Sequence, residues 1–524
     1  MEVVYAHLFA SILAILHLKY LVPLLIGTVA GVIGGALPGI TITMTIIMVL
    51  PFTFGLDPLQ GLAAMTGVYV GGSAGGSITA SLIGIPGTPS AIATTFDGFP
   101  MTRKGEPGRA IWIGVWSAFL GGLLGGLFLI AATGPLASVA LQFGPWEFFS
   151  LFVFALSMVA GLVGTSITKG LLSGAIGLVI TVVGSDPIMG VPRLTLGTDF
   201  LRGGFPFLPV LIGIFAFAQL MSDIEKMRSA GSPGGSSAAP VAKLRVSQLV
   251  VLWEVLSRPF LLIWSTLVGI LIGVLPAIGG SAANVMAYDQ AKKFSRHPEK
   301  FGTGIPEGII ASESSNNANV AGSLVTIMAF GIPGDAVTAV MLGAMTIHGI
   351  QPGPLFISQH PAVAYGIYAA YLVSLPLMVL VIAVGARAWL RIITIPKAIL
   401  IPVVLVLCVI GAYALNNIMD DVYVLLLFGL VGYALVKFGI PLAPLILGLI
   451  LGDQIEVNLV RAIANDPNPW LFITHPISGG LLAASVASVV FAFWQHRRAL
   501  SAAAGRPRNC PARPRAAAAR SALR

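Results

Sequence analysis

The chain has 524 residues, of which 56% are hydrophobic and only 9% are charged, and its formal net charge is +9. A soluble domain carries about 25% charged residues, so the composition excludes a water-exposed globular surface and predicts a protein that faces lipid. Two cysteines and seven scattered histidines give neither a disulfide framework nor a metal-ligand spacing. We therefore expect no cofactor and no metal beyond a possible Na⁺.

Long uncharged runs predict the membrane segments. Residues 20–56, 58–96, 110–146, 259–288 and 336–386 contain no Asp, Glu, Lys or Arg, and a spanning helix needs about 20 apolar residues. The sequence therefore predicts an all-α polytopic membrane protein with about 10 to 12 transmembrane helices.

The second half of the chain repeats landmarks of the first half in the same order. The matched pairs are Leu37-Pro38-Gly39 with Leu275-Pro276-Ala277, residues 73–77 with 319–323, and Gly84-Ile85-Pro86-Gly87 with Gly331-Ile332-Pro333-Gly334. Landmarks that keep both their order and nearly their spacing indicate an internal duplication.

This duplication predicts how the chain is divided. We expect a first membrane repeat over 1–222, a cytoplasmic linker over 223–258, a second membrane repeat over 259–496 and a disordered basic tail over 497–524. The linker holds a flexible Gly/Ser/Pro stretch. The tail holds eight arginines and no acids, which predicts a cytoplasmic C-terminus. Nucleic acid is the other partner that such a tail could have, but it lacks aromatic residues for base stacking, so we expect none.

The charges of the loops predict how the two repeats are oriented. Loops 97–109 and 289–300 are rich in Lys and Arg, whereas residues 51–58 and 347–356 have none. Because basic loops stay in the cytoplasm, corresponding loops of the two halves should lie on opposite faces, as in inverted-topology repeats. The basic residues on both sides of 259–288 further predict a re-entrant segment that bends at Leu-Pro. A single long tilted helix is the alternative, because Pro is tolerated in membrane helices.

Residues 69–90 are candidates for a substrate site. Their density of Gly and Pro argues against a regular helix, and broken backbone in a bilayer occurs where it is buried or lines a cavity. The N–H groups freed at such breaks suit an anion. Close helix packing through small residues is the alternative, but two matched copies favour a binding site. The predicted substrate-binding residues of this copy are Ser73, Gly75, Gly76, Ser77, Thr79, Pro86, Gly87 and Thr88.

The second copy is more polar. Its asparagines offer both donors and acceptors to a carboxylate or a cation without adding charge. The predicted substrate-binding residues of this copy are Asn316, Asn317, Asn319, Gly322, Ser323, Pro333 and Gly334. Glu313 would cost about 2.5–3.5 kcal/mol inside the bilayer. It is either a cation or proton site, or an interfacial acid that pairs with Lys300 or caps a helix. The predicted cation-coupling residues are Pro38, Gly39, Pro276 and Glu313.

Several activities lack their motifs in this chain. There is no phosphate-binding loop of an ATPase and no zinc-protease or nucleophile-elbow motif. We therefore expect a protein that is not an enzyme and that takes its energy from an ion gradient or from a separate subunit. A channel would instead show repeated polar rings along a pore.

Several of these motifs together resemble the large membrane subunit of the tripartite tricarboxylate transporters. The resemblance runs from about residue 20 to 495, and the stretches that carry it are 34–39, 69–80, 85–88, 97–101, 186–193, 302–304, 313–318, 331–335 and 411–417. The family's second Leu-Pro-Gly is Leu275-Pro276-Ala277 in this chain.

The resemblance implies a multi-pass protein of the bacterial inner membrane. It also implies two partners, a small four-helix membrane subunit and a periplasmic solute-binding protein. The expected activity is import of a di- or tricarboxylate such as citrate, coupled to Na⁺ or H⁺. A secondary transporter or channel for another small organic anion is the alternative.

Overall fold

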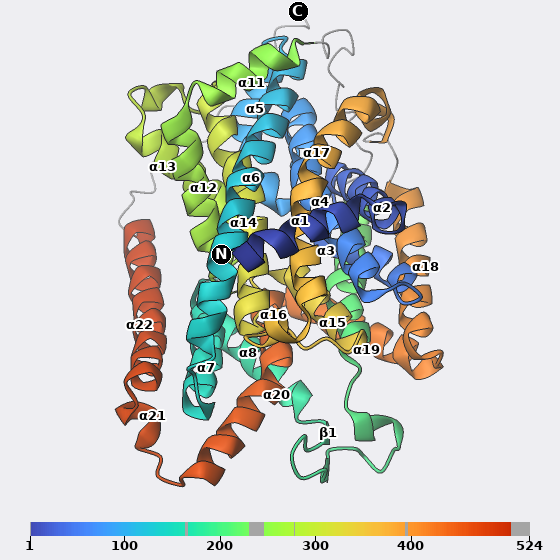
Figure 1. The fold of residues 1–524 in the computed structure, drawn as a ribbon, viewed down its shortest axis with the longest axis vertical. Helices are drawn as coiled ribbons and strands as arrows, with labels where there is room; N and C mark the ends of the chain where they lie inside the picture. The colour runs from blue at the N-terminus through green and yellow to red at the C-terminus, as the bar shows by residue number, and fades with distance from the viewer. Residues whose placement is uncertain (1, 163–165, 230–245, 277, 393–396, 505–524) are drawn as a thin grey trace, which may run out of the picture.

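The computed structural model describes residues 2–162, 166–229, 246–276, 278–392 and 397–504 (Figure 1). Helices make up almost all of this part, and the strands are two short ones, β1 (Gly184–Ser185) and β2 (Pro192–Arg193), which pair antiparallel. The α-helices are α1 Glu2–Leu16, α2 Leu18–Ala36, α3 Ile42–Val49, α4 Pro58–Ile83, α5 Thr94–Arg103, α6 Pro107–Ala140, α7 Pro145–Leu162, α8 Ile167–Thr181, α9 Phe207–Leu211, α10 Ala218–Ser229, α11 Gln248–Leu256, α12 Pro259–Val274, α13 Gly280–Phe294, α14 Pro306–Phe330, α15 Ala336–Ile347, α16 Phe356–Gln359, α17 Pro361–Ile392, α18 Lys397–Asn416, α19 Met419–Lys437, α20 Leu442–Asn465, α21 Leu471–Thr474 and α22 Pro476–Ala504. Short helical turns are η1 Leu50–Thr53, η2 Pro89–Ala91, η3 Phe200–Gly203, η4 Ile212–Phe217 and η6 Pro298–Lys300.

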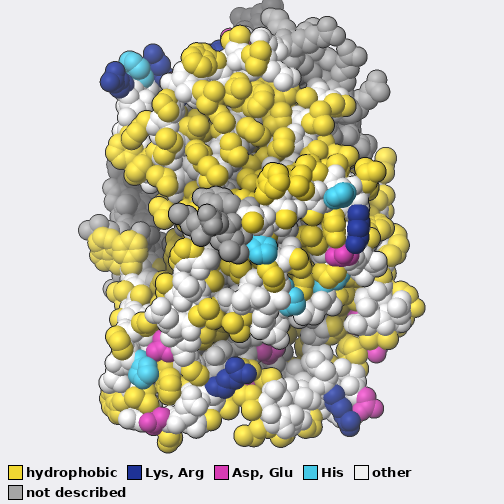
Figure 2. Space-filling model, in the orientation of Figure 1, with side chains coloured by type: hydrophobic (Ala, Val, Ile, Leu, Met, Phe, Trp, Pro, Cys, Tyr) yellow, Lys and Arg dark blue, Asp and Glu magenta, His cyan; other side chains and the backbone are white. Residues whose placement is uncertain are grey.

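The lengths and compositions of these helices confirm an all-α polytopic membrane protein. Within the described residues, eight helices are long and apolar enough to cross a membrane, and the bent pair α11–α12, with 78° between its parts, could supply a ninth. The 26-residue α4 and the 25-residue α14 are also of membrane length, but they are rich in small and polar residues and almost wholly buried. Figure 2 shows a broad area of hydrophobic side chains over the upper half of the visible face, with no Lys or Arg within it.

The helices follow the duplicated landmarks. The series α2, α3, α4, α5 and α6 recurs in the same order as α12, α13, α14, α15 and α17. Both Leu-Pro landmarks interrupt a helix, because α2 ends at Ala36 before α3 and α12 ends at Val274 before α13. The bends at Leu-Pro are thus confirmed, and α12 and α13 pack against each other, which excludes a single long helix over 259–288.

The basic loops of the two halves meet at one end of the molecule, where Figure 1 shows α5, α11 and α13. The guanidinium group of Arg109 donates to Glu254 over 2.7 and 3.1 Å, and that of Arg258 donates to Glu307 over 2.8 Å. The loops without Lys or Arg, 51–58 and 347–356, meet elsewhere, because a side-chain carbon added at Gly61, just after the first of them, would lie 3.3 Å from the His348 ring. The β1–β2 loop lies at the opposite end of the molecule in Figure 1.

The two central helices cross in opposite directions. The Asn316 amide of α14 donates to the carbonyl of Ser73 in α4 over 2.9 Å. One turn further along α4, Ser77 lies beside Gly114 of α6, and so does Glu313, which is one turn earlier in α14. Contacts that advance along α4 while they go back along α14 show that these equivalent helices are antiparallel.

One sequence expectation is wrong. Residues 69–83 are regular α-helix inside α4, and residues 311–323 are regular α-helix inside α14. The breaks occur only at Gly84 and Gly331, which end these helices with φ of 69° and 71°, a left-handed conformation that favours glycine. In the residues that precede Gly84 and Gly331, helix packing therefore outweighs the low helix propensity of the sequence.

Close packing explains why α4 and α14 stay helical. A side-chain carbon added at Gly31 of α2 would lie 2.3 Å from the Val68 carbonyl oxygen, and one added at Gly71 would lie 2.5 Å from that of Thr28. The backbones of α2 and α4 can approach this closely only because glycines stand at the contact. The alternative reading of the glycines, close helix packing, thus holds for this part of α4.

The predicted division into two repeats, a linker and a tail stays a prediction. Residues 230–245 of the predicted linker, Ala277 and residues 505–524 of the predicted tail lie outside the described residues. The linker's ends coincide with α10 and α11, and α22 continues to Ala504.

Candidate substrate site

A cavity of about 360 Å³ lies where the two repeats meet. Each repeat supplies residues from its Leu-Pro bend, its central helix and its Gly-Ile-Pro-Gly turn. Apolar residues of η4, α19 and α20 complete the wall. The polar residues and the glycines that line it are Thr41, Thr43, Tyr69, Ser73, Thr88, Ser90 and Gln219 from the first repeat and Gly279, Gly280, Ser281, Asn316, Asn319 and Asp335 from the second.

The first turn of α13 is the strongest candidate for an anion site. Its N-cap is Gly279, with φ of 76° and no side chain to cap the helix, and Gly280 and Ser281 line the cavity. The first N–H groups of a helix have no partner within the helix and carry partial positive charge. By contrast, Thr41 accepts a hydrogen bond from Met44 at the start of α3, so that helix end is already capped.

Two amides of α14 stand beside the start of α13. A side-chain carbon added at Gly280 would lie 2.9 Å from Asn316 Oδ1 and 3.5 Å from Asn319 Nδ2. Only glycine leaves room here for the amides and a ligand. Among the described residues, Asn319 Oδ1 has no hydrogen-bond partner, although Asn319 is only 1% exposed. A buried polar atom without a partner is costly, and a ligand in the cavity would supply one.

Of the residues predicted to bind the substrate, some line the cavity and others lie outside its lining. Of the predicted substrate-binding set, the residues that line it are Ser73, Thr88, Asn316, Asn319 and Pro333. The predicted residues that do not line it are Gly75, Gly76, Ser77, Thr79, Pro86, Gly87, Asn317, Gly322, Ser323 and Gly334.

The two Gly-Ile-Pro-Gly turns pack in equivalent ways. A side-chain carbon added at Gly87 would lie 2.0 Å from the Gly35 carbonyl oxygen, and one added at Gly334 would lie 2.7 Å from that of Gly273. In each repeat, the second glycine of the turn therefore presses on the last turn before the Leu-Pro bend. This contact fixes the position of the polar residue that follows, Thr88 in the first copy and Asp335 in the second.

Asn317 faces away from the cavity. Its amide nitrogen lies 3.7 Å from Met378 Sδ, and its backbone carbonyl accepts a hydrogen bond from the Tyr371 hydroxyl over 3.1 Å. Asn317 therefore lies in the contact between α14 and α17.

Glu313 lies about two turns inside α14 and is fully buried. The hydroxyl of Thr94 donates to one carboxyl oxygen, and the other has no partner among the described residues. This position excludes the reading of Glu313 as a helix cap or an interfacial acid paired with Lys300. Glu313 does not line the cavity, and neither do Pro38, Gly39 and Pro276, which stand in the turns that lead to α3 and α13.

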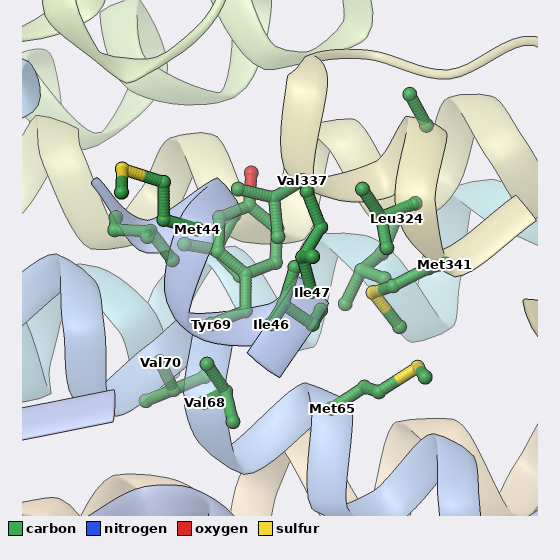
Figure 3. Close-up of a cluster of buried hydrophobic side chains, with 14 of the residues drawn as sticks. Met44, Ile46, Ile47, Met65, Val68, Tyr69, Val70, Leu324, Val337 and Met341 are labelled. Carbon is green, nitrogen blue, oxygen red and sulfur yellow. The ribbon is translucent and has the colours of Figure 1, made fainter. Parts of the chain in front are cut away.

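Asp335 and Tyr69 line the cavity but are not among the residues predicted from the sequence. Asp335 caps α15, and its carboxylate accepts hydrogen bonds from the N–H groups of Val337 and Thr338 over 3.1 and 2.9 Å. The Tyr69 hydroxyl donates to the other carboxyl oxygen, and Figure 3 shows that hydroxyl pointing toward Val337 at the start of α15. The sequence feature that points to Asp335 is the duplicated Gly-Ile-Pro-Gly turn, because only its second copy is followed directly by an acidic residue.

No Lys, Arg or His is among the described residues that line the cavity. Any positive potential for an anion must therefore come from helix N-termini, hydroxyls and amides.

Comparison with known families decides the class of this protein. The model of the tripartite tricarboxylate transporter TctA family matches residues 21–447. The chain belongs to this family. It is thus a multi-pass membrane subunit of a transporter, and the resemblance noted in the sequence is confirmed.

Two proteins of Agrobacterium vitis are similar to this chain. An uncharacterized 52.8 kDa protein of the TAR-I ttuC′ 3′ region is 36% identical over 471 residues, which are 89% of this chain and 92% of that protein. An uncharacterized protein of the TAR-II ttuC′ 3′ region is 36% identical over 225 residues, which are 43% of this chain and 93% of that protein. No solved structure matches this chain.

Proposed function

We propose that this chain is the membrane-translocating subunit of a binding-protein-dependent, cation-coupled secondary transporter that imports a di- or tricarboxylate such as citrate. Its partners would be a small four-helix membrane subunit and a periplasmic solute-binding protein. The basic loops beside Arg109 and Arg258 and the C-terminal tail would lie on the cytoplasmic side of a bacterial inner membrane. The coupling ion would be Na⁺ or H⁺.

The observation that carries this proposal is the cavity shared by the two repeats. Its volume of about 360 Å³ is within the range of small-molecule sites. It lies between antiparallel equivalent helices, which is where secondary transporters with inverted repeats bind their substrates. Family membership supports a transporter subunit, and the helix starts and amides support an anionic substrate.

In the proposed complex, one carboxylate group of the substrate accepts hydrogen bonds from the free N–H groups at the start of α13. The amide N–H of Asn319 holds the same group from the side of α14, while Asn316 donates its amide to the Ser73 carbonyl and presents its oxygen to the start of α13. Ser73, Thr88 and Ser90 also line the cavity. The Ser73 hydroxyl donates to the Tyr69 carbonyl over 2.9 Å, whereas Thr88 and Ser90 share one hydrogen bond of 3.1 Å, which leaves one proton of that pair for a second carboxylate or a substrate hydroxyl.

The test is uptake of labelled citrate into proteoliposomes that contain this chain and the small subunit and are supplied with the binding protein. Asn319→Ala should weaken citrate binding about 10- to 100-fold, because a hydrogen bond to a charged group contributes roughly 1.5–3 kcal/mol. The matched control is Asn458→Ala in α20, whose amide donates to the backbone carbonyl of Gln454 in its own helix over 2.7 Å. Equal citrate binding and uptake in wild type and Asn319→Ala would refute the assignment of the site.

A further inference from the structure

The substrate cavity holds an acid that its proposed function does not explain. Asp335 is 9% exposed and lines the cavity. Its β-carbon would lie 3.6 Å from a side-chain carbon added at Gly279, the N-cap of α13. The carboxyl group therefore stands beside the helix start where we place the anionic substrate.

In the described part of the chain, no cationic side chain in the cavity balances the charge of this acid, which has only neutral donors and the N-terminus of α15 beside it. Among the described residues, no Lys, Arg or His lines the cavity, and Tyr69 of α4 is the only other titratable group that does. The other walls present Thr41 and Thr43 from the first Leu-Pro bend, glycines and Ser281 from α13, amides from α14 and Gln219 beside η4, with apolar residues from α19 and α20. The groups that contact the carboxylate are all neutral donors, namely Tyr69, Val337 and Thr338.

An ionised Asp335 would repel a carboxylate substrate bound at the same place. Two like charges that share a site of low dielectric do not both ionise unless a proton or a metal cation neutralises one of them. A candidate ligand for such a cation is present, because Asn319 lines the same cavity and its Oδ1 has no partner among the described residues. Carbonyl and carboxylate oxygens are the ligands that hard cations prefer.

The first copy of the repeat shows that the acid is not needed to build the turn. Thr88 occupies the position of Asp335 after the first Gly-Ile-Pro-Gly and also lines the cavity. The same backbone turn therefore forms with a neutral residue. The acid is present in the second copy alone, so the two copies differ in charge at this position.

On the basis of the proposed function, we infer that a monovalent cation, Na⁺ or H⁺, binds at Asp335. The anionic substrate can occupy the cavity only when this cation is bound. Asp335 is then the residue that couples the substrate to the ion gradient. Glu313, which was predicted from the sequence as a cation-coupling residue, lies outside the lining of this cavity.

The experiment measures citrate binding to the purified complex of this chain with the small subunit. Conditions are acid or alkaline pH, each with sodium chloride or with choline chloride. Wild type should bind citrate roughly 5- to 150-fold more weakly in alkaline choline than in the best condition, which is the usual range of coupling between two ligands. Recovery on adding Na⁺ at alkaline pH assigns the cation as sodium, and recovery on acidification in choline assigns it as a proton. Either result supports the inference.

Asp335→Asn should bind citrate with the same affinity in all four conditions. Asparagine is as good an N-cap as aspartate, so α15 should still form. A variant that keeps the wild-type dependence on the cation, or one that binds no citrate in any condition, would overturn the inference. Tyr69→Phe removes a donor and leaves the carboxylate, so this variant should keep the dependence on the cation. Loss of the dependence on the cation in Tyr69→Phe, together with its retention in Asp335→Asn, would also overturn the inference.

Two outcomes separate this inference from the proposed function. Wild type that binds citrate equally well in every condition refutes the inference and leaves the substrate site standing. Wild type that binds no citrate in any condition refutes the proposed function and the inference with it. If the cation is Na⁺, thermal stability without citrate gives a second readout, because Na⁺ should stabilise the wild type and not Asp335→Asn.

Discussion

The contact between α12 and α14 allows a quantitative test of the packing that shapes the site. A side-chain carbon added at Gly273 would lie 2.4 Å from the carbonyl oxygen of Asn319 and 3.0 Å from the α-carbon of Gly322. Non-bonded heavy atoms prefer about 3.5–4.0 Å, so Gly273→Ala must separate the two helices by about 1 Å. Overpacking of this kind costs about 1–3 kcal/mol.

The matched control is Gly480→Ala in α22. This glycine is also helical, and an added side-chain carbon would meet nothing within 4 Å. Alanine should therefore bring only its higher helix propensity, about 1 kcal/mol. Because Gly273 is helical as well, this gain applies to both substitutions and cancels, so their effects on stability should differ by the overpacking cost of about 1–3 kcal/mol.

The assay is thermal unfolding of the purified protein in detergent. The apparent midpoint of Gly273→Ala should fall clearly below that of the wild type, while the midpoint of Gly480→Ala should stay level or rise. Gly35→Ala, at the equivalent contact of α2 with the carbonyl oxygen of Gly72 at 2.3 Å, should behave like Gly273→Ala. A midpoint for Gly273→Ala at or above that of Gly480→Ala would refute the claim that these glycines set the approach of the helices.

Two further predictions concern a buried acid and a partly buried acid outside the cavity. Asp97→Ala removes the acceptor for three backbone N–H groups of the turn before α14 and for the Tyr288 hydroxyl. In thermal unfolding it should cost about 3 kcal/mol or more, whereas Tyr288→Phe should cost about 1 kcal/mol. Similar losses of stability in the two variants would contradict this prediction. The backbone N–H groups of Met189 and Ile188 lower the pKa of Asp186. The stabilisation of the loop by Asp186 should therefore be complete above about pH 4 and lost as the pH falls further. Pepsin should cleave the loop more readily at the lower pH, and Asp186→Asn should abolish this pH dependence of loop stability.

The sequence by itself determined the class of the fold and the landmarks of the site. The composition required a lipid-facing surface, because 9% charged residues cannot cover a soluble protein of this length. The matched Leu-Pro and Gly-Ile-Pro-Gly motifs marked the places where helices end. Gly84 and Gly331 end α4 and α14 in a left-handed conformation that favours glycine, and α2 and α12 end directly before Leu-Pro. The opposed loop charges predicted the antiparallel arrangement of the halves.

The tertiary structure alone decided which residues of those motifs face the cavity. Glycine-rich residues 69–83 stay helical because α2 packs closely against them, and a local propensity contains no information about that neighbour. Asn317 and Asn319 are two residues apart in α14, so they point to different sides of the helix, and only the position of α13 shows that Asn319 borders the cavity. Asp335 meets Tyr69 across 266 residues of chain, a distance that no local pattern spans.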